Sequence, residues 1–316
     1  MLTKTKSGML LLLLALIPSC WANALRPDGA LSQVEAIDRA RYVSSLHYDL
    51  QFNLASGKEA FSGQVEIGFA LSAQPTKPIN LDFAGGDVDR LQINGTEITS
   101  VPYDGLVIRL DPELLREGRN QLQVVFSHPY SNNSTGLFRF VDPADQAVYL
   151  YSHFEPFDAN QLFPCFDQPD LKATYQLVAT VPEHWQVISS NRETSVQGEG
   201  PHRTWRFPPS KRFSTYLFPL HAGPYKVWTD ADSKIPSRLF ARRSLAAHID
   251  AEEWFAATRF GLKFFQEYFD YPYPYHKYDQ LLVPEHAGGA MENVAAVTFS
   301  DQWLVQRGES TSKERD

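Results

Sequence analysis

Short runs in which apolar and polar residues alternate dominate the first two thirds of the chain, and they constrain its fold more than any other feature. The clearest run covers residues 47–54, where Tyr48, Leu50 and Phe52 stand between polar neighbours. A period of two is typical of a strand with one buried face. Similar runs follow at 65–71, 122–126 and 175–181, with Gly, Pro, Asn and Asp between them. The sequence therefore predicts an antiparallel all-β domain of packed sheets, since a single sheet would leave an apolar face in water.

The pattern changes after residue 224. One more strand-like stretch at 235–241 is followed by a long segment, 245–269, with helical spacing. Asp250 lies near its start and suits the positive end of a helix dipole, and prolines at 272 and 274 end it. Six residues are expected to supply its apolar face: Phe255, Phe260, Leu262, Phe264, Phe265 and Phe269.

Two further strands are expected at 281–283 and 294–299, on either side of the turn at Gly288 and Gly289. A mixed α/β domain therefore begins in this region, with too few elements to close a core of its own. The predicted fold is mainly β. Its predicted parts are a signal peptide at 1–24, an amino-terminal β domain at 25–228, and the incomplete start of a second domain at 229–316.

The first residues have the features of an export signal. Lys4 and Lys6 precede an apolar run at 9–17, and Ala22-Asn23-Ala24 offers a cleavage site. The run is about half of the roughly 20 residues that a membrane-spanning helix needs. We therefore expect an exported protein, periplasmic or secreted, with no transmembrane helix beyond the signal peptide. The alternative is a membrane lipoprotein, because residues 17–20 resemble a lipoprotein box in which Cys20 would carry the lipid anchor.

The net charge argues against one class of partner, and the cysteine content argues against an intrachain disulfide. The formal net charge is −8, and loss of Lys4 and Lys6 with the signal peptide makes it more negative. This balance argues against nucleic acid as a partner. Cleavage also removes Cys20 and leaves Cys165 alone, so no intrachain disulfide is expected. We expect Cys165 to be a small buried apolar side chain.

Five residues carry the clearest chemical signal: Gly289, Ala290, Met291, Glu292 and Asn293. Glycine lets a backbone come close to a ligand, and a strand edge offers main-chain donors and acceptors to an extended peptide. Glu292 would place a carboxylate beside that edge, where a peptide's terminal ammonium group could bind. From these residues alone, the alternative is an ordinary glycine turn with a solvated glutamate.

A second segment makes the resemblance to a known family specific. Residues 149–174 read Y-L-Y-S-H-F-E-P-F-D-A-N-Q-L-F-P-C-F-D-Q-P-D-L-K-A-T. Together with G-A-M-E-N, this segment resembles the aminopeptidase N family of zinc aminopeptidases, a gluzincin family. The resemblance implies an amino-terminal β-sandwich or saddle domain followed by the start of a thermolysin-like α/β catalytic domain. It covers nearly all of the chain after the signal peptide.

The resemblance also implies a substrate site. In the family, a glutamate that matches Glu155 and the glutamate of G-A-M-E-N, here Glu292, together bind the α-ammonium group of the substrate. Peptides with a free amino terminus are therefore the expected partners, and residues 289–293 with Glu155 are the expected substrate-binding residues. His153 departs from the family's usual glutamine, which leaves open the shape of the pocket for the first side chain.

Hydrolysis in this family depends on Zn²⁺ held by H-E-x-x-H and a later glutamate. No two of the nine histidines are four residues apart, so this motif is not in the sequence. We therefore expect no catalytic residue and no metal ligand in this chain, and we expect that it stops short of the zinc motif of a full-length family member. His286 is interpreted as a hydrogen-bonded or surface histidine rather than a lone ligand.

Two other functions stay open. The chain could be a non-catalytic remnant or a module that binds peptide amino termini without cleaving them. The leukotriene hydrolase branch, which opens an epoxide at the same zinc site, is less consistent with the glycine-alanine signature and Glu155.

Overall fold

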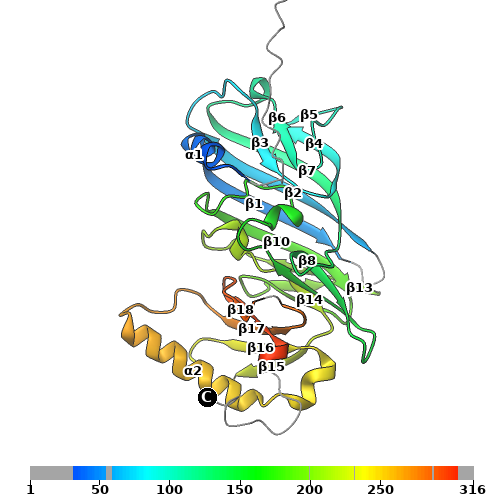
Figure 1. Cartoon of the computed structure of the whole chain (residues 1–316), viewed down its shortest axis with the longest axis vertical. Helices are drawn as coiled ribbons and strands as arrows, with labels where there is room; N and C mark the ends of the chain where they lie inside the picture. Colours follow the sequence, from blue (N-terminus) through cyan, green and yellow to red (C-terminus); the bar gives the residue numbers. More distant parts are fainter. Residues whose placement is uncertain (1–30, 55–58, 199, 231, 287, 305–316) are drawn as a thin grey trace, which may run out of the picture.

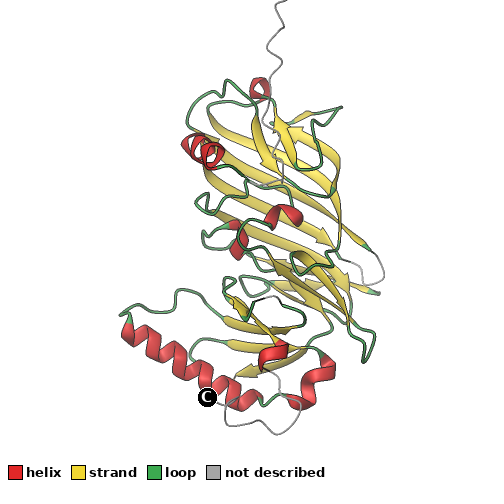
Figure 2. Ribbon diagram, in the orientation of Figure 1, coloured by secondary structure: helices red, strands yellow, loops and turns green. Residues whose placement is uncertain are grey.

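The computed structural model describes residues 31–304 except 55–58, 199, 231 and 287, and it is built mostly of strands (Figure 2). The predicted signal peptide and Cys20 lie outside the described residues. Among the described helices, none is long and apolar enough to cross a bilayer.

The largest element is an eight-stranded sheet, and its central strand β1 (Val43–Asn53) shows the predicted alternation, with Tyr48, Leu50 and Phe52 buried. In spatial order the sheet consists of β12 (Ser195–Gln197), β13 (His202–Phe207), β10 (Ala173–Pro182), β1, β2 (Ala60–Leu71), β7 (Gly118–Pro129), β4 (Asp87–Ile93) and β5 (Thr96–Glu97). One feature differs from the prediction of an antiparallel domain, because β1 and β10 pair in parallel. More than a hundred residues separate them, so the connection is long enough for parallel pairing.

Smaller sheets pack onto this one. A four-stranded sheet has the order β11 (Gln186–Ile188), β14 (His221–Gly223), β9 (Val148–His153), β8 (Gly136–Val141), and β3 (Ile79–Asp82) pairs with β6 (Val107–Leu110). Apolar residues of all three sheets belong to one core, which includes Tyr48, Leu81 and Leu150. The predicted packing of sheets is therefore confirmed. The helical pieces of this region are α1 (Gln33–Tyr42), η1 (Pro112–Leu114), η2 (Ala159–Gln161) and η3 (Thr215–Leu217).

A five-stranded sheet forms the other end of the molecule (Figure 1). Its order is β15 (Lys226–Asp230), β16 (Ser237–Ala241), β17 (Tyr278–Val283), β19 (Ala296–Ser300), β18 (Ala290–Met291). One face packs against β8 and β9, where Phe240 and Leu281 share a core with Phe138 and Tyr149. The other face is covered by α2 (Ala251–Tyr268), and η4 (Arg243–His248) and α3 (Asp301–Leu304) flank the sheet. This is the expected start of an α/β unit. The predicted division at 228–229 falls inside β15, and the division itself stays a prediction.

The long helix differs from its prediction in extent and in the face that it buries. It begins at Ala251 rather than at 245, because the side chain of Asp250 caps it by accepting hydrogen bonds from the backbone N–H groups of Glu252 and Glu253. Of the six predicted face residues, Phe255 is buried against the sheet and Leu262 is half-buried. The other four are exposed, with Phe260 at 72%. Trp254 and Phe255 make the contact instead, because one short sheet covers only the first turns of the helix.

Candidate functional site

The five residues 289–293 form an edge of the five-stranded sheet. β18 pairs with β19 on one side only, through Ala290 with Phe299 and Met291 with Thr298, and its other side has no strand partner in the described chain. Gly289, Ala290 and Glu292 are exposed, whereas Met291 and Asn293 are 1% exposed. No heavy atom lies within 4 Å of the place where a Cβ of Gly289 would stand. The edge therefore has room beside it, as a peptide-binding strand needs.

Glu155 lies two residues beyond the end of β9 and is exposed, while its neighbour Phe154 is fully buried and anchors the segment. The backbone N–H of Asp158 donates to the carbonyl of Phe154 at 2.8 Å, which closes a turn around Glu155. The position of this carboxylate is thus determined by a buried aromatic residue on one side and by a tight turn on the other.

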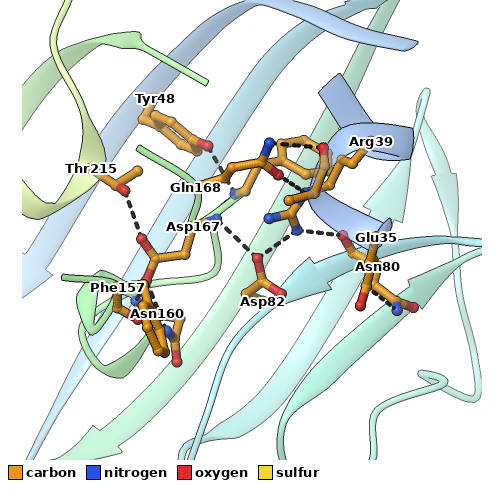
Figure 3. Close-up of polar contacts among 12 residues, drawn as sticks. Glu35, Arg39, Tyr48, Asn80, Asp82, Phe157, Asn160, Asp167, Gln168 and Thr215 are labelled. Atoms are coloured by element: carbon orange, nitrogen blue, oxygen red, sulfur yellow. Dashed lines mark hydrogen bonds and ion pairs between the residues drawn. The ribbon is translucent and has the colours of Figure 1, made fainter. Parts of the chain in front are cut away.

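A buried polar network holds the remainder of the Glu155 segment (Figure 3). The carboxylate of Asp167 accepts hydrogen bonds from the backbone N–H and side-chain amide of Asn160, at 2.9 and 2.8 Å, and from Thr215 Oγ1 at 2.6 Å. Burial raises the pKa of Asp167 to about 6 in spite of these bonds. Its backbone N–H donates to Asp82, which forms an ion pair of 2.6 Å with Arg39 of α1. The segment that carries Glu155 is therefore tied to β3 and to α1.

The segments that carry Glu155 and Glu292 meet at two places. The rings of His153 and His286 pack edge to face, with centroids 4.9 Å apart. The second meeting place is the stretch 215–220, which binds both segments. Ser152 Oγ accepts a hydrogen bond of 2.9 Å from the N–H of Leu220, and the N–H of Val294 donates to the carbonyl of Leu217 at 3.1 Å. One ring contact and one shared partner stretch therefore hold the two segments together.

Neither Glu155 nor Glu292 has a hydrogen bond or an ion pair with another described residue. The buried acid Asp279 of the five-stranded sheet behaves differently, because it binds both Arg238 and Lys277. An exposed carboxylate without an internal cation can bind an external one. The two predicted ligands of the ammonium group are thus among the exposed acids that have no cation partner in the described chain.

The described residues do not fit the zinc ion that the resemblance implies. No group of three or more His, Cys, Asp or Glu side chains in the described chain comes together as metal ligands do. His153 and His286 pack edge to face at an interplanar angle of 71°, and no third ligand joins these two rings in the described chain. In addition, His286 Nδ1 bonds the backbone of Gly288 at 2.8 Å, in keeping with its interpretation as a hydrogen-bonded histidine.

A cavity of about 540 Å³ lies elsewhere, between α1 and the β3–β6 pair, and Arg39, Tyr42 and Asn80 are among its lining residues. None of the predicted site residues borders it. Figure 1 shows α1 in the upper part of the molecule and β18 in the lower part. Cys165 is fully buried in the main core, as predicted, and burial raises the pKa of its thiol.

Sequence reasoning missed a buried charged cluster against the turn at Ala295, which follows the 289–293 edge. Lys277, at the start of β17, is 1% exposed and its Nζ donates to Asp279 Oδ2 and to the carbonyl of Ala295, each at 2.8 Å. Burial lowers the pKa of Lys277 to about 8. Arg238 binds the same carboxylate with two nitrogens. The only sequence signal was Lys277 two residues before Asp279, at the start of an apolar strand. This spacing does not show that the lysine binds the carbonyl of Ala295.

Comparisons with known proteins agree over most of the chain. Residues 44–217 match the Peptidase M1 N-terminal domain, and residues 255–316 match the Peptidase family M1 domain. The chain is 39% identical over 287 residues to Aminopeptidase N of Streptomyces lividans, which covers 89% of this chain and 33% of that protein. It is 30% identical over 231 residues to Probable aminopeptidase 1 of Sulfurisphaera tokodaii, which covers 70% of this chain and 28% of that protein. The chain thus spans about a third of the length of these relatives.

Proposed function

The chain belongs to peptidase family M1, and on that premise we propose that it carries the amine-binding part of an aminopeptidase site. In this proposal, the carboxylates of Glu155 and Glu292 bind the α-ammonium group of a peptide. The peptide's first residues lie along the free edge of β18, which supplies main-chain hydrogen bonds. The observation that carries the proposal is that both acids are exposed, lack an internal cation, and stand on segments held together at His153 and His286.

Two carboxylates around one cation explain a preference for chain ends. A terminal ammonium group can donate a charge-assisted hydrogen bond to each acid, whereas an internal peptide group is neutral and has a single N–H. An internal segment would leave both acids desolvated without a counter-charge, which is unfavourable. The arrangement therefore supports binding of the amino-terminal residue rather than an internal residue.

We propose at the level of the family that a protein containing this chain removes amino-terminal residues from peptides. Its relatives named as aminopeptidases support this activity. Zn²⁺ would supply the activated water, with ligands outside this chain, since the sequence contains no H-E-x-x-H. We assign no hydrolytic step to the described residues. Export to the periplasm or the medium is part of the proposal and rests on residues 1–24 alone, as does the alternative of a lipid anchor at Cys20.

A module that binds peptide amino termini without cleaving them is the second candidate. It is favoured by the same two free acids together with a sequence that lacks the zinc motif. Both candidates require amine binding by Glu155 and Glu292, and they differ in whether hydrolysis of an alanyl substrate accompanies it.

Titration calorimetry with tri-alanine tests the shared requirement. We expect Glu155→Gln and Glu292→Gln each to weaken binding about tenfold or more, because each removes a charged hydrogen bond worth roughly 1.5–3 kcal/mol. Glu285→Gln is the matched control, since it removes an exposed acid from the same loop and should leave the affinity within about twofold. Equal affinities for the wild type and for either Gln variant at 155 or 292 would exclude the proposed site.

A further inference from the structure

The turn that follows Glu292 has an unusual backbone. Ala295 has a φ of +56°, in the left-handed region that alanine rarely adopts. The N–H of Ala296 donates to the carbonyl of Asn293 at 3.1 Å and closes the turn. Such a conformation persists only where the surrounding structure holds it. The direction in which the chain passes from Glu292 into β19 therefore depends on contacts made to this turn.

The contacts come from β17 and its first flanking residue. The carbonyl oxygen of Ala295 accepts hydrogen bonds from Lys277 Nζ at 2.8 Å and from the N–H of Asp279 at 3.1 Å. Because Lys277 is 1% exposed, its ammonium group has little water to bind instead. The side-chain hydrogen bond is thus a buried, charge-assisted contact to the residue that holds the turn in place.

Charged groups around Lys277 support this contact. Asp279 accepts from Lys277 Nζ and also binds Arg238 with two nitrogens, at 3.0 and 2.6 Å. Arg238 in turn reaches Glu193 on the neighbouring β domain at 3.5 Å. The cation of Arg192 repels the ammonium group of Lys277. Lys277 in turn helps to lower the pKa of the buried ring of His221. The network therefore connects the turn to Glu193, between β11 and β12, through Lys277, Asp279 and Arg238.

Few other hydrogen bonds hold the segment that carries Glu292, although Met291 and Val294 within it are buried. β18 pairs with two residues of β19. Among the described residues, its other backbone hydrogen bonds to neighbouring segments include the one from Ser300 N–H to the carbonyl of Gly289, at 3.0 Å, and the one from Val294 N–H to the carbonyl of Leu217. A two-residue edge strand has few backbone hydrogen bonds to resist displacement.

We propose that Lys277 is a positioning residue for the amine-binding site, which holds the carbonyl of Ala295 and thereby directs Glu292 toward the ligand. The inference that Lys277 directs Glu292 rests on the proposed function of Glu292. The contact between Lys277 and the turn can be tested without a ligand. Lys277 touches no ligand. It acts through the turn at 293–296.

Hydrogen exchange tests whether Lys277 holds the turn, independently of whether Glu292 binds a ligand. In the folded Lys277→Met variant, the amides of residues 292–297 should exchange about tenfold faster or more, while those of β2 and β7 keep their wild-type rates. Lys277→Gln keeps a hydrogen-bond donor, so its exchange rates at 292–297 should lie between those of the wild type and those of Lys277→Met. The matched control is Lys263→Met, which removes an exposed lysine from α2. Wild-type exchange at 292–297 in folded Lys277→Met would overturn the proposal, whether or not the chain binds peptides.

Binding of tri-alanine gives the second readout. Lys277→Met should weaken binding about tenfold in the wild-type background and change it by less than about twofold in the Glu292→Gln background, because both changes remove the same contact. An equal loss in both backgrounds would show that Lys277 acts elsewhere and would overturn the positioning role. If the wild type does not bind tri-alanine, the proposed function fails, and the exchange experiment alone decides whether Lys277 holds the turn.

Discussion

His221 shows how burial at a single residue makes the fold sensitive to pH. Its ring is fully buried and Nδ1 faces the backbone N–H of Ser152 at 3.4 Å. Burial, with a further contribution from the Lys277 cation, lowers the pKa of His221 to about 3. The unfolded chain therefore binds the additional proton between about pH 6.5 and pH 3, and the free energy of unfolding falls as the pH drops through this window.

The prediction is that His221→Gln loses less stability than the wild type when the pH is lowered from 7 to 5. Each pH unit in the window is worth about 1.4 kcal/mol for one fully coupled group. Urea denaturation at the two pH values measures the difference, and His248→Gln, at an exposed histidine, is the control. Parallel losses in the wild type and the His221 variant would contradict the role of this ring.

At the residue scale, features that depend on the local pattern of residues could be predicted from the sequence. Features that depend on burial between distant segments were missed. Cys165 lies in an apolar run, so its burial could be predicted. Glu155 and Glu292 were singled out by resemblance, and their role stays a proposal. Lys277 and His221 could not be found, because a lysine or a histidine in a sequence does not show which groups lie above it. Their importance arises from contacts between segments far apart in the chain.

At the element scale, strands were predicted well and their partners were not. Alternation in β1, β2, β7 and β10 reports a buried face, which is a property of each strand alone. The parallel pairing of β1 with β10 depends on the whole topology and has no local signal. The apolar face of α2 was wrong for a related reason, since aromatic spacing shows that a helix is amphipathic but not how much of it a neighbour covers.

The corrected face of α2 can be tested with two matched substitutions. Phe255→Ala should cost about 3–5 kcal/mol, because this ring is 3% exposed and packs against Leu239 and Leu282. Phe260→Ala on the same helix should change stability by no more than about 0.5 kcal/mol, since that ring is 72% exposed. Urea denaturation compares the two, and the reverse order would restore the face expected from the sequence.

At the scale of the whole molecule, a buried ion pair joins the four-stranded sheet to the five-stranded sheet. Arg242 binds Asp142, just after β8, at 2.6 Å and Asp301, in α3, at 2.8 Å. Their side chains are nearly inaccessible to solvent. This contact lies beside the shared core of Phe138, Tyr149 and Phe240. Apolar packing and paired charge together explain how segments carrying Glu155 and Glu292 can be held in one arrangement.

We expect Arg242→Met to destabilise the fold by about 3 kcal/mol, because it leaves two buried carboxylates without their guanidinium contact. Lys263→Met, which breaks an exposed pair with Glu267, should cost less than about 0.5 kcal/mol. Thermal and urea unfolding check both values. A loss for Arg242→Met as small as that of the control would show that this pair does not join the two sheets.

The central claim is that this chain binds the free amino terminus of a peptide between Glu155 and Glu292. The most direct measurement is calorimetric titration of the wild-type chain with tri-alanine and with N-acetyl-tri-alanine, which differ in the charge of the first nitrogen. We predict that tri-alanine binds and that acetylation weakens binding about a hundredfold, because it removes the cation that both carboxylates require. Equal affinity for the two peptides, or no binding of tri-alanine, would contradict the claim.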